Sequence, residues 1–384
     1  MWISFAIPYI MEIGVEENER KSRCSYSMFY LLMGGFIIAL LIAVVMTPIV
    51  KQMAIRWNAI DKPNHRKVHT KLMPRLGGLA IYLAFLVSFI FVVPKNMLTY
   101  GILVGGTVIV IIGVIDDKIQ LSPKAKLLGQ LAAAIIVVLF GLRVEFINLP
   151  FDGIYTFGWL SIPFTILWMI SVSNAINLID GLDGLAAGVS GIAAATIFIM
   201  SLIIGNYTVS FLSISLLGAI IGFLFFNFYP AKIFMGDSGA LFLGFMLAAM
   251  SILGFKYVTL FAFIMPILIL GVPISDTFFA IIRRMANNKP ISEADNHHLH
   301  HRLLQLGLSH RQTVIVIYGV SMLFGISAII FNQATLWGAA LIVGFLLLFL
   351  ELAVEAIGLV SKNYKPIIGR IERHIQKQQQ KQHY

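Results

Sequence analysis

The feature that most constrains this chain is a succession of long apolar runs separated by short polar connections. A helix needs roughly 17 to 25 apolar residues to cross about 30 Å of hydrocarbon, and eleven runs reach or approach that length. With 59% hydrophobic residues, 12% charged residues and a mean hydropathy of +0.88, the 384-residue chain is too apolar for a soluble domain. The sequence therefore predicts an all-α polytopic integral membrane protein with about eleven transmembrane helices. They cover residues 28–50, 76–93, 100–115, 126–142, 158–177, 185–205, 207–229, 233–254, 256–282, 313–331 and 335–360.

The basic residues predict the orientation of these helices, because Lys and Arg resist translocation across a bilayer. The connection 51–75 is rich in both, every second connection after it is basic again, and so is the chain beyond residue 361. This pattern places the C-terminus in the cytoplasm and the N-terminus outside. It also accounts for most of the net charge of +10, so the expected partner is the lipid bilayer and no nucleic acid.

Three segments are expected along the chain. Residues 1–27 form a polar, acidic N-terminal extension, with a true start at Met28 as an open alternative. Residues 28–360 form the transmembrane domain with its active-site loops on the cytoplasmic side, and residues 361–384 form a basic, Gln-rich cytoplasmic tail. The single cysteine, Cys24, indicates neither an intrachain disulfide nor a zinc site.

Acidic residues are informative here, because a carboxylate near a bilayer needs a structural or chemical reason. Beyond the N-terminal extension, most of them fall at the predicted cytoplasmic ends of helices. Asp116 and Asp117 close an apolar run, and adjacent carboxylates repel unless a metal, a proton or a cation shares their site. Lys124 and Lys126 follow and can meet phosphate as point charges. A solvated helix end is the alternative for this pair of acids.

The segment 174–188, N-A-I-N-L-I-D-G-L-D-G-L-A-A-G, is the most informative in the chain. Asn174, Asn177, Asp180 and Asp183 recur every three residues, and a helix through them would place the amides and at least the first acid along one face. Their oxygen atoms suit a hard cation such as Mg²⁺ and the polar edges of a nucleotide. A polar turn with caps is the alternative.

Two later clusters lie on the same predicted side. In F-M-G-D-S-G-A, Asp237 opens the eighth apolar run, where an N-cap is the alternative explanation. The late loop contains N-H-H-L-H-H-R, whose imidazoles and arginine suit phosphate and sugar hydroxyls, with a zinc site or a plain surface loop as alternatives. Asp276 is left outside the predicted site, because a structural ion pair explains it equally well.

With these four clusters in this order, the chain resembles the polyprenyl-phosphate N-acetylhexosamine-1-phosphate transferases, glycosyltransferase family 4, from about residue 49 to about residue 311. The resemblance rests on D-K-P-N-H-R-K-V-H, D-D, N-A-I-N-L-I-D-G-L-D-G-L, A-K-I-F-M-G-D-S-G-A and H-H-L-H-H-R-L-L. It is strongest to the bacterial branch that starts wall teichoic acid linkage units, and weaker to the branch that transfers phospho-MurNAc-pentapeptide.

The resemblance implies roles for individual residues. Asn177 and Asp237 would hold Mg²⁺, with Mn²⁺ as the alternative ion, against the donor diphosphate. Asp116 and Asp117 would lie where the lipid phosphate arrives, and one of them would orient or deprotonate it. The implied substrate-binding residues are Lys126 for the diphosphate, Asn174, Asp180 and Asp183 for the nucleotide, and His297, His298, His300, His301 and Arg302 for phosphate and the N-acetyl sugar. Lys62, Arg66 and His69 match the family pattern without an assigned step.

The implied activity is transfer of GlcNAc-1-phosphate from UDP-GlcNAc to undecaprenyl phosphate, with release of UMP, at the cytoplasmic face of the bacterial plasma membrane. The resemblance also allows a homodimer. A single in-line step and a two-step route through an aspartyl-phosphate both stay open. The alternatives are another UDP-N-acetylhexosamine or UDP-MurNAc-pentapeptide as donor and, in a different class, a secondary transporter, which would place its acids near the midplane.

Overall fold

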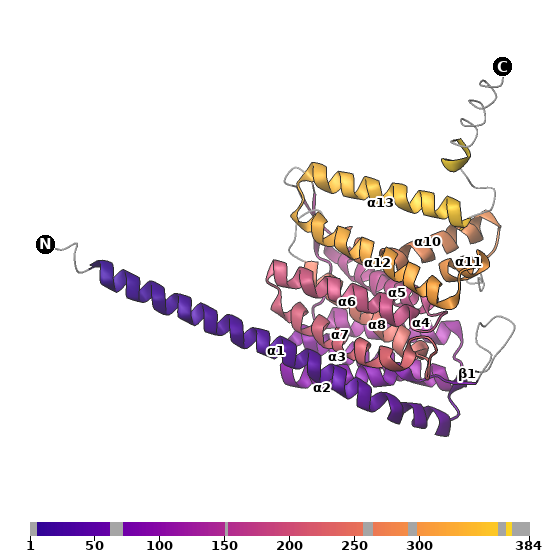
Figure 1. The fold of residues 1–384 in the computed structure, drawn as a ribbon, viewed down its shortest axis with the longest axis horizontal. Helices are drawn as coiled ribbons and strands as arrows, with labels where there is room; N and C mark the ends of the chain where they lie inside the picture. The colour runs from indigo at the N-terminus through magenta and orange to yellow at the C-terminus, as the bar shows by residue number, and fades with distance from the viewer. Residues whose placement is uncertain are drawn as a thin grey trace, which may run out of the picture.

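The computed structural model describes residues 6–61, 72–149, 153–255, 264–290, 298–359 and 366–370, and it is almost entirely helical (Figure 1). Two short antiparallel ribbons interrupt the helices: β1 (Ile60–Asp61) pairs with β2 (Met73–Pro74), and β3 (Phe146–Leu149) pairs with β4 (Gly153–Thr156). The helices are α1 (Ala6–Arg56), α2 (Gly77–Val92), α3 (Met97–Ile119), α4 (Pro123–Leu139), the 3₁₀ turn η1 (Gly158–Leu160), α5 (Ser161–Ile179), α6 (Leu185–Ile204), α7 (Tyr207–Asn227), α8 (Gly236–Phe255), α9 (Ile264–Ile269), α10 (Gly271–Ala286), α11 (Leu299–Gln305), α12 (His310–Gln333) and α13 (Leu336–Ile357).

Eight helical segments of the described chain are long and apolar enough to cross a membrane. They lie in α1, α3, η1 with α5, α6, α7, α8, α12 and α13, and α2 is a shorter apolar helix of 16 residues. The chain is therefore a multi-pass helical membrane protein, as predicted. The count of about eleven spans and the orientation stay predictions, because α4 and α10 are shorter than these eight segments.

The ninth predicted span, 256–282, is not one helix over its described part. α9 ends at Ile269, and Leu270 lies outside the helical region of backbone space before α10 begins at Gly271. Pro273 lies in the first turn of α10, where a backbone N–H would have no acceptor within the helix, so the missing N–H of proline is tolerated. The division follows from this backbone change and was not visible in the hydropathy of the run.

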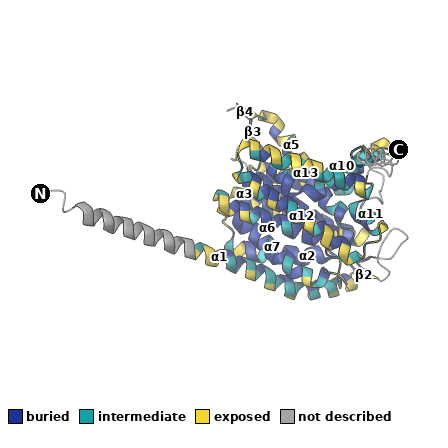
Figure 2. Cartoon of the chain, turned by 45° about the horizontal axis from the view of Figure 1, so that its top comes forward, coloured by how far each residue is buried: buried dark blue, intermediate teal, exposed yellow. Residues whose placement is uncertain are grey.

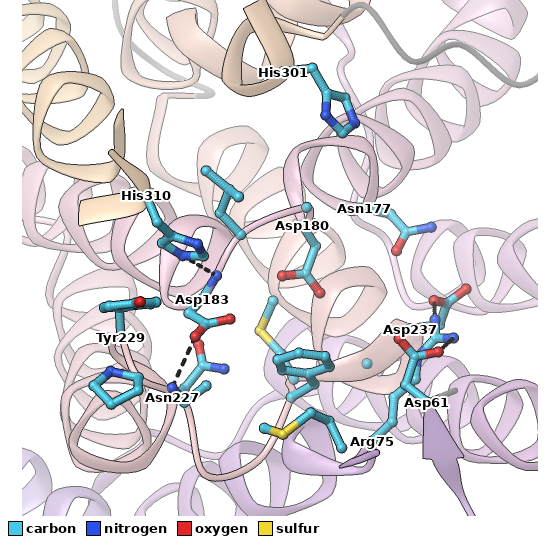
Figure 3. Close-up of a pocket in the computed structure, with 18 of the residues that line it drawn as sticks. Asp61, Arg75, Asn177, Asp180, Asp183, Asn227, Tyr229, Asp237, His301 and His310 are labelled. Carbon is cyan, nitrogen blue, oxygen red and sulfur yellow. Dashed lines mark hydrogen bonds and ion pairs between the residues drawn. The ribbon is translucent and has the colours of Figure 1, made fainter. Parts of the chain in front are cut away.

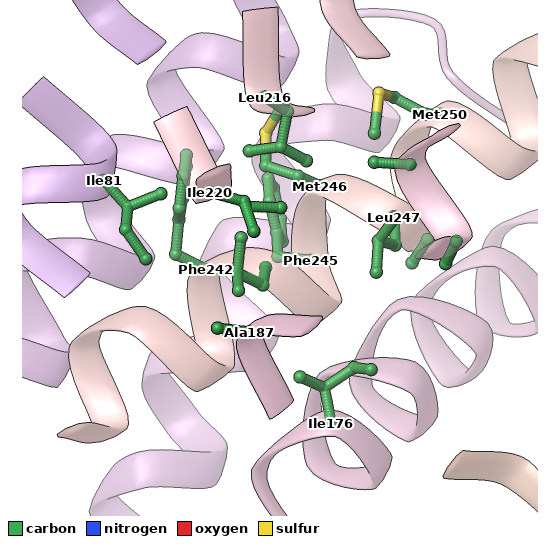
Figure 4. Packing of buried hydrophobic residues seen from close by; sticks show 14 of the residues in the cluster. Ile81, Ile176, Ala187, Leu216, Ile220, Phe242, Phe245, Met246, Leu247 and Met250 are labelled. Atoms are coloured by element: carbon green, nitrogen blue, oxygen red, sulfur yellow. The ribbon is translucent and has the colours of Figure 1, made fainter. Parts of the chain in front are cut away.

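α8 stands at the centre of the bundle and packs against α2, α3, α5, α6 and α7. It is the most buried of the eight apolar segments, whereas α13 is the least buried. Figure 2 shows the buried residues gathered in the interior of the helical bundle. Phe242, Phe245 and Met246 of α8 lie among Ile81 of α2 and Ile220 of α7 (Figure 4). Because apolar lipid surrounds such helices, close packing of this kind is a main source of their association. It fixes the first turn of α8, which carries Asp237.

Two glycines bring α2 and α3 into backbone contact with that first turn. A Cβ added at Gly78 of α2 would lie 1.9 Å from the backbone nitrogen of Gly239. A Cβ added at Gly113 of α3 would lie 2.3 Å from the Cα of Ser238. Small residues permit approaches this close between membrane helices. The contact at Gly113 places the end of α3, with Asp116 and Asp117, beside the start of α8.

The segment before α2 pairs with the segment before α8, although the two are far apart in the sequence. Arg75 forms a parallel bridge with Phe234, whose backbone N–H donates to the carbonyl of Pro74 at 2.9 Å. The N–H groups of Gly77 and Gly78 donate to the carbonyls of Phe234 and Met235 at 2.9 and 2.8 Å. This pairing positions the side chain of Arg75 directly beside α8.

Candidate active site

Residues from three of the predicted clusters, together with Lys126, line one cavity of about 660 Å³ (Figure 3). Its wall comes from β1 and β2, the start of α4, the turn between α5 and α6, the segment between α7 and α8, and residues of α11 and α12. A cavity of this volume is in the usual range for a small-molecule site. Among its lining residues, the acidic and basic side chains are Asp61, Arg75, Lys126, Asp180, Asp183 and Asp237.

Asp237 is the centre of the charged wall. Its Oδ1 accepts a hydrogen bond from Arg75 Nη2, and its Oδ2 lies 2.5 Å from Lys126 Nζ. The first turn of α8 also presents the positive end of the helix dipole to this carboxylate. Asp237 is buried, so its charge is compensated by two cations and a helix terminus rather than by water.

Asp116 and Asp117 lie behind these cations. Asp116 Oδ2 contacts Lys126 Nζ at 2.6 Å, and Asp117 Oδ1 contacts Arg75 Nε at 3.0 Å. Asp117 also accepts the backbone N–H of Asp237 at 2.8 Å, and from Ser238 the N–H at 3.1 Å and the hydroxyl at 2.6 Å. It thus stabilises the start of α8, whose first N–H groups lack partners within the helix.

Both acids of the D-D pair lie in the last turn of α3, which ends at Ile119, so they stand near a helix end as predicted. Neither of them is among the residues that line the cavity. Their predicted contact with the lipid phosphate stays a prediction. The repulsion expected between adjacent carboxylates is relieved by two separate cations.

A face shared by Asn174, Asn177, Asp180 and Asp183 would need one helix through all four, but the predicted spans 158–177 and 185–205 already left a break between them. α5 ends at Ile179, and the chain turns before α6 begins at Leu185, where Gly184 adopts a positive φ of 75°. Asn177, Asp180 and Asp183 line the cavity, whereas Asn174 faces Gln130 and exchanges hydrogen bonds of 2.7 and 3.3 Å with it. Spacing alone did not separate the buried amide from the three cavity residues.

Two lining groups outside the membrane-spanning segments, Asp180 and Arg75, have displaced pKa values. Burial raises the pKa of Asp180 to about 7, against the opposing charge of Arg75. For Arg75, burial lowers the pKa, but the carboxylates of Asp237 and Asp117 more than offset this and hold it above its ordinary value. Arg75 therefore stays charged in the cavity at any working pH.

The turn that carries Asp183 is anchored to α12 and to the segment before α8. The backbone N–H of Asp183 donates to His310 Nε2 at 3.0 Å, and Asp183 Oδ2 accepts the N–H of Ala231 at 2.9 Å. The His310 ring lies 4.5 Å from the ring of Tyr229, centre to centre. Asp183 is thus fixed at the cavity wall, with two aromatic rings beside it (Figure 3).

The late histidines divide into different environments, and His297 lies outside the described residues. His298 Nδ1 contacts Asp276 Oδ2 at 2.9 Å, and both side chains are buried. His300 is buried against Gly181, and burial lowers its pKa to about 3. Only His301 of the described part of this cluster lines the cavity. Arg302 is likewise absent from the lining and contacts Gln305 at 3.3 Å.

Sequence reasoning missed several polar lining residues, namely Arg75, Asp61, Asn227, Tyr229 and His310. Arg75 was counted only as a topological charge of its basic connection. A usable signal was present, because Arg75 stands next to the apolar run and is followed by L-G-G, a combination that permits close backbone packing. Lys62, Arg66 and His69 lie outside the described residues.

The donor set fits a hard divalent cation. Asn177 and Asp237 both line the cavity with oxygen atoms, and the four lining carboxylates exceed the two lining cations, Arg75 and Lys126. Among the described residues, no group of three or more His, Cys, Asp and Glu side chains is arranged to hold a metal alone. Mg²⁺ is commonly held in this way, by one or two protein ligands with substrate phosphates and water completing the shell.

Comparison with known proteins agrees with this geometry. The model of a family described as glycosyl transferase family 4 matches residues 99–255. The chain is 47% identical over 347 residues to the probable undecaprenyl-phosphate N-acetylglucosaminyl 1-phosphate transferase of Bacillus subtilis (strain 168), covering 89% of this chain and 97% of the relative.

Two further relatives carry other names. A decaprenyl-phosphate N-acetylglucosaminephosphotransferase of Mycobacterium leprae (strain TN) is 37% identical over 337 residues, 78% of this chain and 85% of the relative. A phospho-N-acetylmuramoyl-pentapeptide-transferase of Halalkalibacterium halodurans is 32% identical over 317 residues, 77% of this chain and 94% of the relative. These alignments cover more than three quarters of the chain, and they agree with the clusters around the cavity. The chain therefore belongs to glycosyl transferase family 4.

Proposed function

We propose that this protein transfers GlcNAc-1-phosphate from UDP-GlcNAc to undecaprenyl phosphate, giving undecaprenyl-diphospho-GlcNAc and UMP. The observation that carries the proposal is Asp237 held between Arg75 and Lys126 in the wall of a nucleotide-sized cavity. The identity of 47% to the Bacillus subtilis transferase supports the choice of lipid and sugar. This reaction would be the first membrane step of a cell-wall glycopolymer, with wall teichoic acid as the expected product.

The reaction balances as a single displacement. An oxygen of the lipid phosphate attacks the phosphorus linked to the sugar, the bond from that phosphorus to the bridging oxygen breaks, and UMP leaves with this oxygen. Little covalent work is asked of the protein, so catalysis comes from positioning and charge stabilisation. Arg75 and Lys126 supply fixed positive charge at the cavity wall, and Asp183 with its anchored turn supplies acceptors for the nucleoside.

The cofactor of this proposal is Mg²⁺, with Mn²⁺ as the alternative. Asn177 and Asp237 would hold it, and when bound it would neutralise charge on the donor diphosphate. The surplus of carboxylates over cations in the lining supports this requirement, because an anionic donor alone would meet net negative charge.

We place the site at the cytoplasmic face. Arg56, Lys118, Lys124 and Lys232 lie in or next to the connections that lead to the cavity. Basic residues are retained on the cytoplasmic side of bacterial membranes, which is also where a soluble nucleotide sugar is available. Labelling of single-cysteine variants at these connections in intact cells tests the orientation, and labelling by an impermeant reagent would contradict it.

The decisive experiment measures UMP release by purified protein with UDP-GlcNAc and undecaprenyl phosphate, with and without Mg²⁺. Asp237→Ala should abolish release, whereas Glu351→Gln, which changes a carboxylate of α13 outside the cavity lining, should not. Lipid-dependent, metal-dependent release would support the proposal. Release only with another UDP-N-acetylhexosamine or with UDP-MurNAc-pentapeptide would change the donor, and no release with any of them would refute the transferase.

A further inference from the structure

The charged groups in and behind the cavity wall form a chain of alternating sign. Lys126 Nζ lies between Asp116, at 2.6 Å, and Asp237, at 2.5 Å. Arg75 lies between Asp117, at 3.0 Å from its Nε, and the same Asp237, which accepts from its Nη2. Each cation is therefore held by its own member of the D-D pair, and both share the central carboxylate.

The cations, and not the acids of the D-D pair, are open to a ligand. The side chains of Arg75 and Lys126 are 24% and 27% exposed, whereas those of Asp117 and Asp116 are 0% and 2% exposed. Both cations line the cavity and neither acid does. The two carboxylates stand behind the cations, so an anion that enters the cavity meets the cations first.

Arg75 is also held rigidly by the backbone. Its parallel bridge to Phe234, and the hydrogen bond from its own N–H to the carbonyl of Ala59 at 3.0 Å, fix its Cα beside the start of α8. Three of its nitrogens reach carboxylates, since Nη1 also lies 4.0 Å from Asp61. A guanidinium is planar and offers several parallel N–H groups, which match phosphate oxygens in pairs. Lys126, in contrast, provides a single point of positive charge.

We propose that Arg75 is a second diphosphate-binding residue, equivalent in place to Lys126, and that Asp117 is the residue that positions it. This inference rests on the proposed function and adds to it. The ammonium of Lys126 and the guanidinium of Arg75, which contact different oxygens of Asp237, both bind the diphosphate of the nucleotide sugar. The acids of the D-D pair act by holding the two cations in place.

The test compares two ligands that differ in the diphosphate. Wild-type protein, Arg75→Gln and Arg75→Lys are titrated with UDP-GlcNAc and with uridine in detergent micelles, by ligand-observed NMR, which detects weak binding. We expect Arg75→Gln to weaken UDP-GlcNAc binding at least 10-fold and to change uridine binding less than 2-fold. Arg75→Lys should give an intermediate loss for UDP-GlcNAc, because it keeps the charge but not the fork. Asp117→Asn should shift the same ratio of affinities in the same direction.

Two results would overturn the inference. The first is an equal loss of affinity for UDP-GlcNAc and for uridine in Arg75→Gln and Arg75→Lys, which would indicate a purely structural role. The second is UDP-GlcNAc binding and UMP release by Arg75→Gln at the wild-type level. Failure of the proposed function can be distinguished from failure of this inference, because in that case the wild-type protein itself would release no UMP from UDP-GlcNAc and undecaprenyl phosphate. If Arg75→Gln does not fold, Arg75→Lys decides the question by the same ratio.

Discussion

Removing the carboxylate of Asp276 should release the helix that carries the late histidines. Asp276 lies in α10, and its two oxygens accept from His298 Nδ1 at 2.9 Å and from the backbone N–H of Leu299 at 2.8 Å. The second bond satisfies the first turn of α11, whose N-cap residue, His298, makes no capping hydrogen bond of its own. One buried carboxylate therefore joins α10 to α11.

The loss of folding stability in the Asp276 variants follows from the two N–H groups that lose their acceptor. Asp276→Ala removes the acceptor of the buried ring N–H of His298 and of the part-buried backbone N–H of Leu299. An unsatisfied buried group costs about 1–3 kcal/mol, so we expect a total loss of stability of roughly 2–4 kcal/mol. Asp276→Asn keeps one oxygen for Leu299 but turns an amide N–H₂ toward His298, which then has to carry its proton on the other nitrogen. We expect Asp276→Asn to lower the free energy of unfolding by about 1–2 kcal/mol.

The assay has two readouts. Thermal unfolding in detergent should rank wild type above Asp276→Asn, and Asp276→Asn above Asp276→Ala. The KM for UDP-GlcNAc should rise in both variants, because His301 lines the cavity from the displaced helix. Ser275→Ala is the matched control, since the Ser275 hydroxyl only donates to the carbonyl of Val272 within α10, and it should change stability by less than about 0.5 kcal/mol. An Asp276→Ala protein as stable as this control, with an unchanged KM, would refute the reasoning.

Three further predictions follow from the packing and charge of the site. Lys126→Gln should lower kcat/KM for UMP release by about 100-fold, the usual scale for losing one group that stabilises transition-state charge, and a change below 3-fold would exclude that role. Burial lowers the pKa of His300 from its ordinary value of 6.5 to about 3, so its contribution to stability is present above pH 6.5 and is lost as the pH falls toward 3. The melting temperature should therefore fall less between pH 7.5 and pH 5 in His300→Gln than in the wild type. Equal falls in the two proteins would contradict this. Gly78→Ala should cost about 1–3 kcal/mol or more, because its Cβ would overlap the backbone of Gly239, whereas Gly34→Ala meets nothing within 4 Å and should be harmless; matched melting curves check the pair.

The sequence predicted the membrane class well, because a hydropathy run reports directly on the solvent that a helix requires. It did not predict the length of each helix. α3 was expected to end at residue 115, yet it continues to Ile119 and carries Asp116 and Asp117 within it. Charged side chains end an apolar run in the sequence, but they do not end a helix whose acids find Lys126 and Arg75 as partners.

The site was predicted in part. The acids and amides of the four clusters attracted attention because charge is rare in this chain, and Asn177, Asp180, Asp183 and Asp237 do line one cavity with Lys126. Arg75 was missed because it was counted with the other charges of a basic connection, and the L-G-G that follows it was not considered.

The assignment of Asn174 to the nucleotide pocket stays a prediction, and its side chain is not among those that line the cavity. A spacing of three residues predicts a shared face only while the helix continues, and it does not reveal that the amide already has Gln130 as its partner.

The pairing of the segment before α2 with the segment before α8 has a consequence for how the protein is made. Arg75 and Asp237 are separated by 162 residues, so α2 and α3 leave the ribosome long before their partner helix is synthesised. Over that interval Arg75 and the D-D pair have no Asp237 and no helix terminus to complete their charges. A nascent chain arrested after α7 would contain the acids of α3 but no cavity. Entry of α8 into the bilayer is therefore the step of biogenesis at which Arg75 and the D-D pair gain their central partner, and α11 and α12 complete the cavity wall only afterwards.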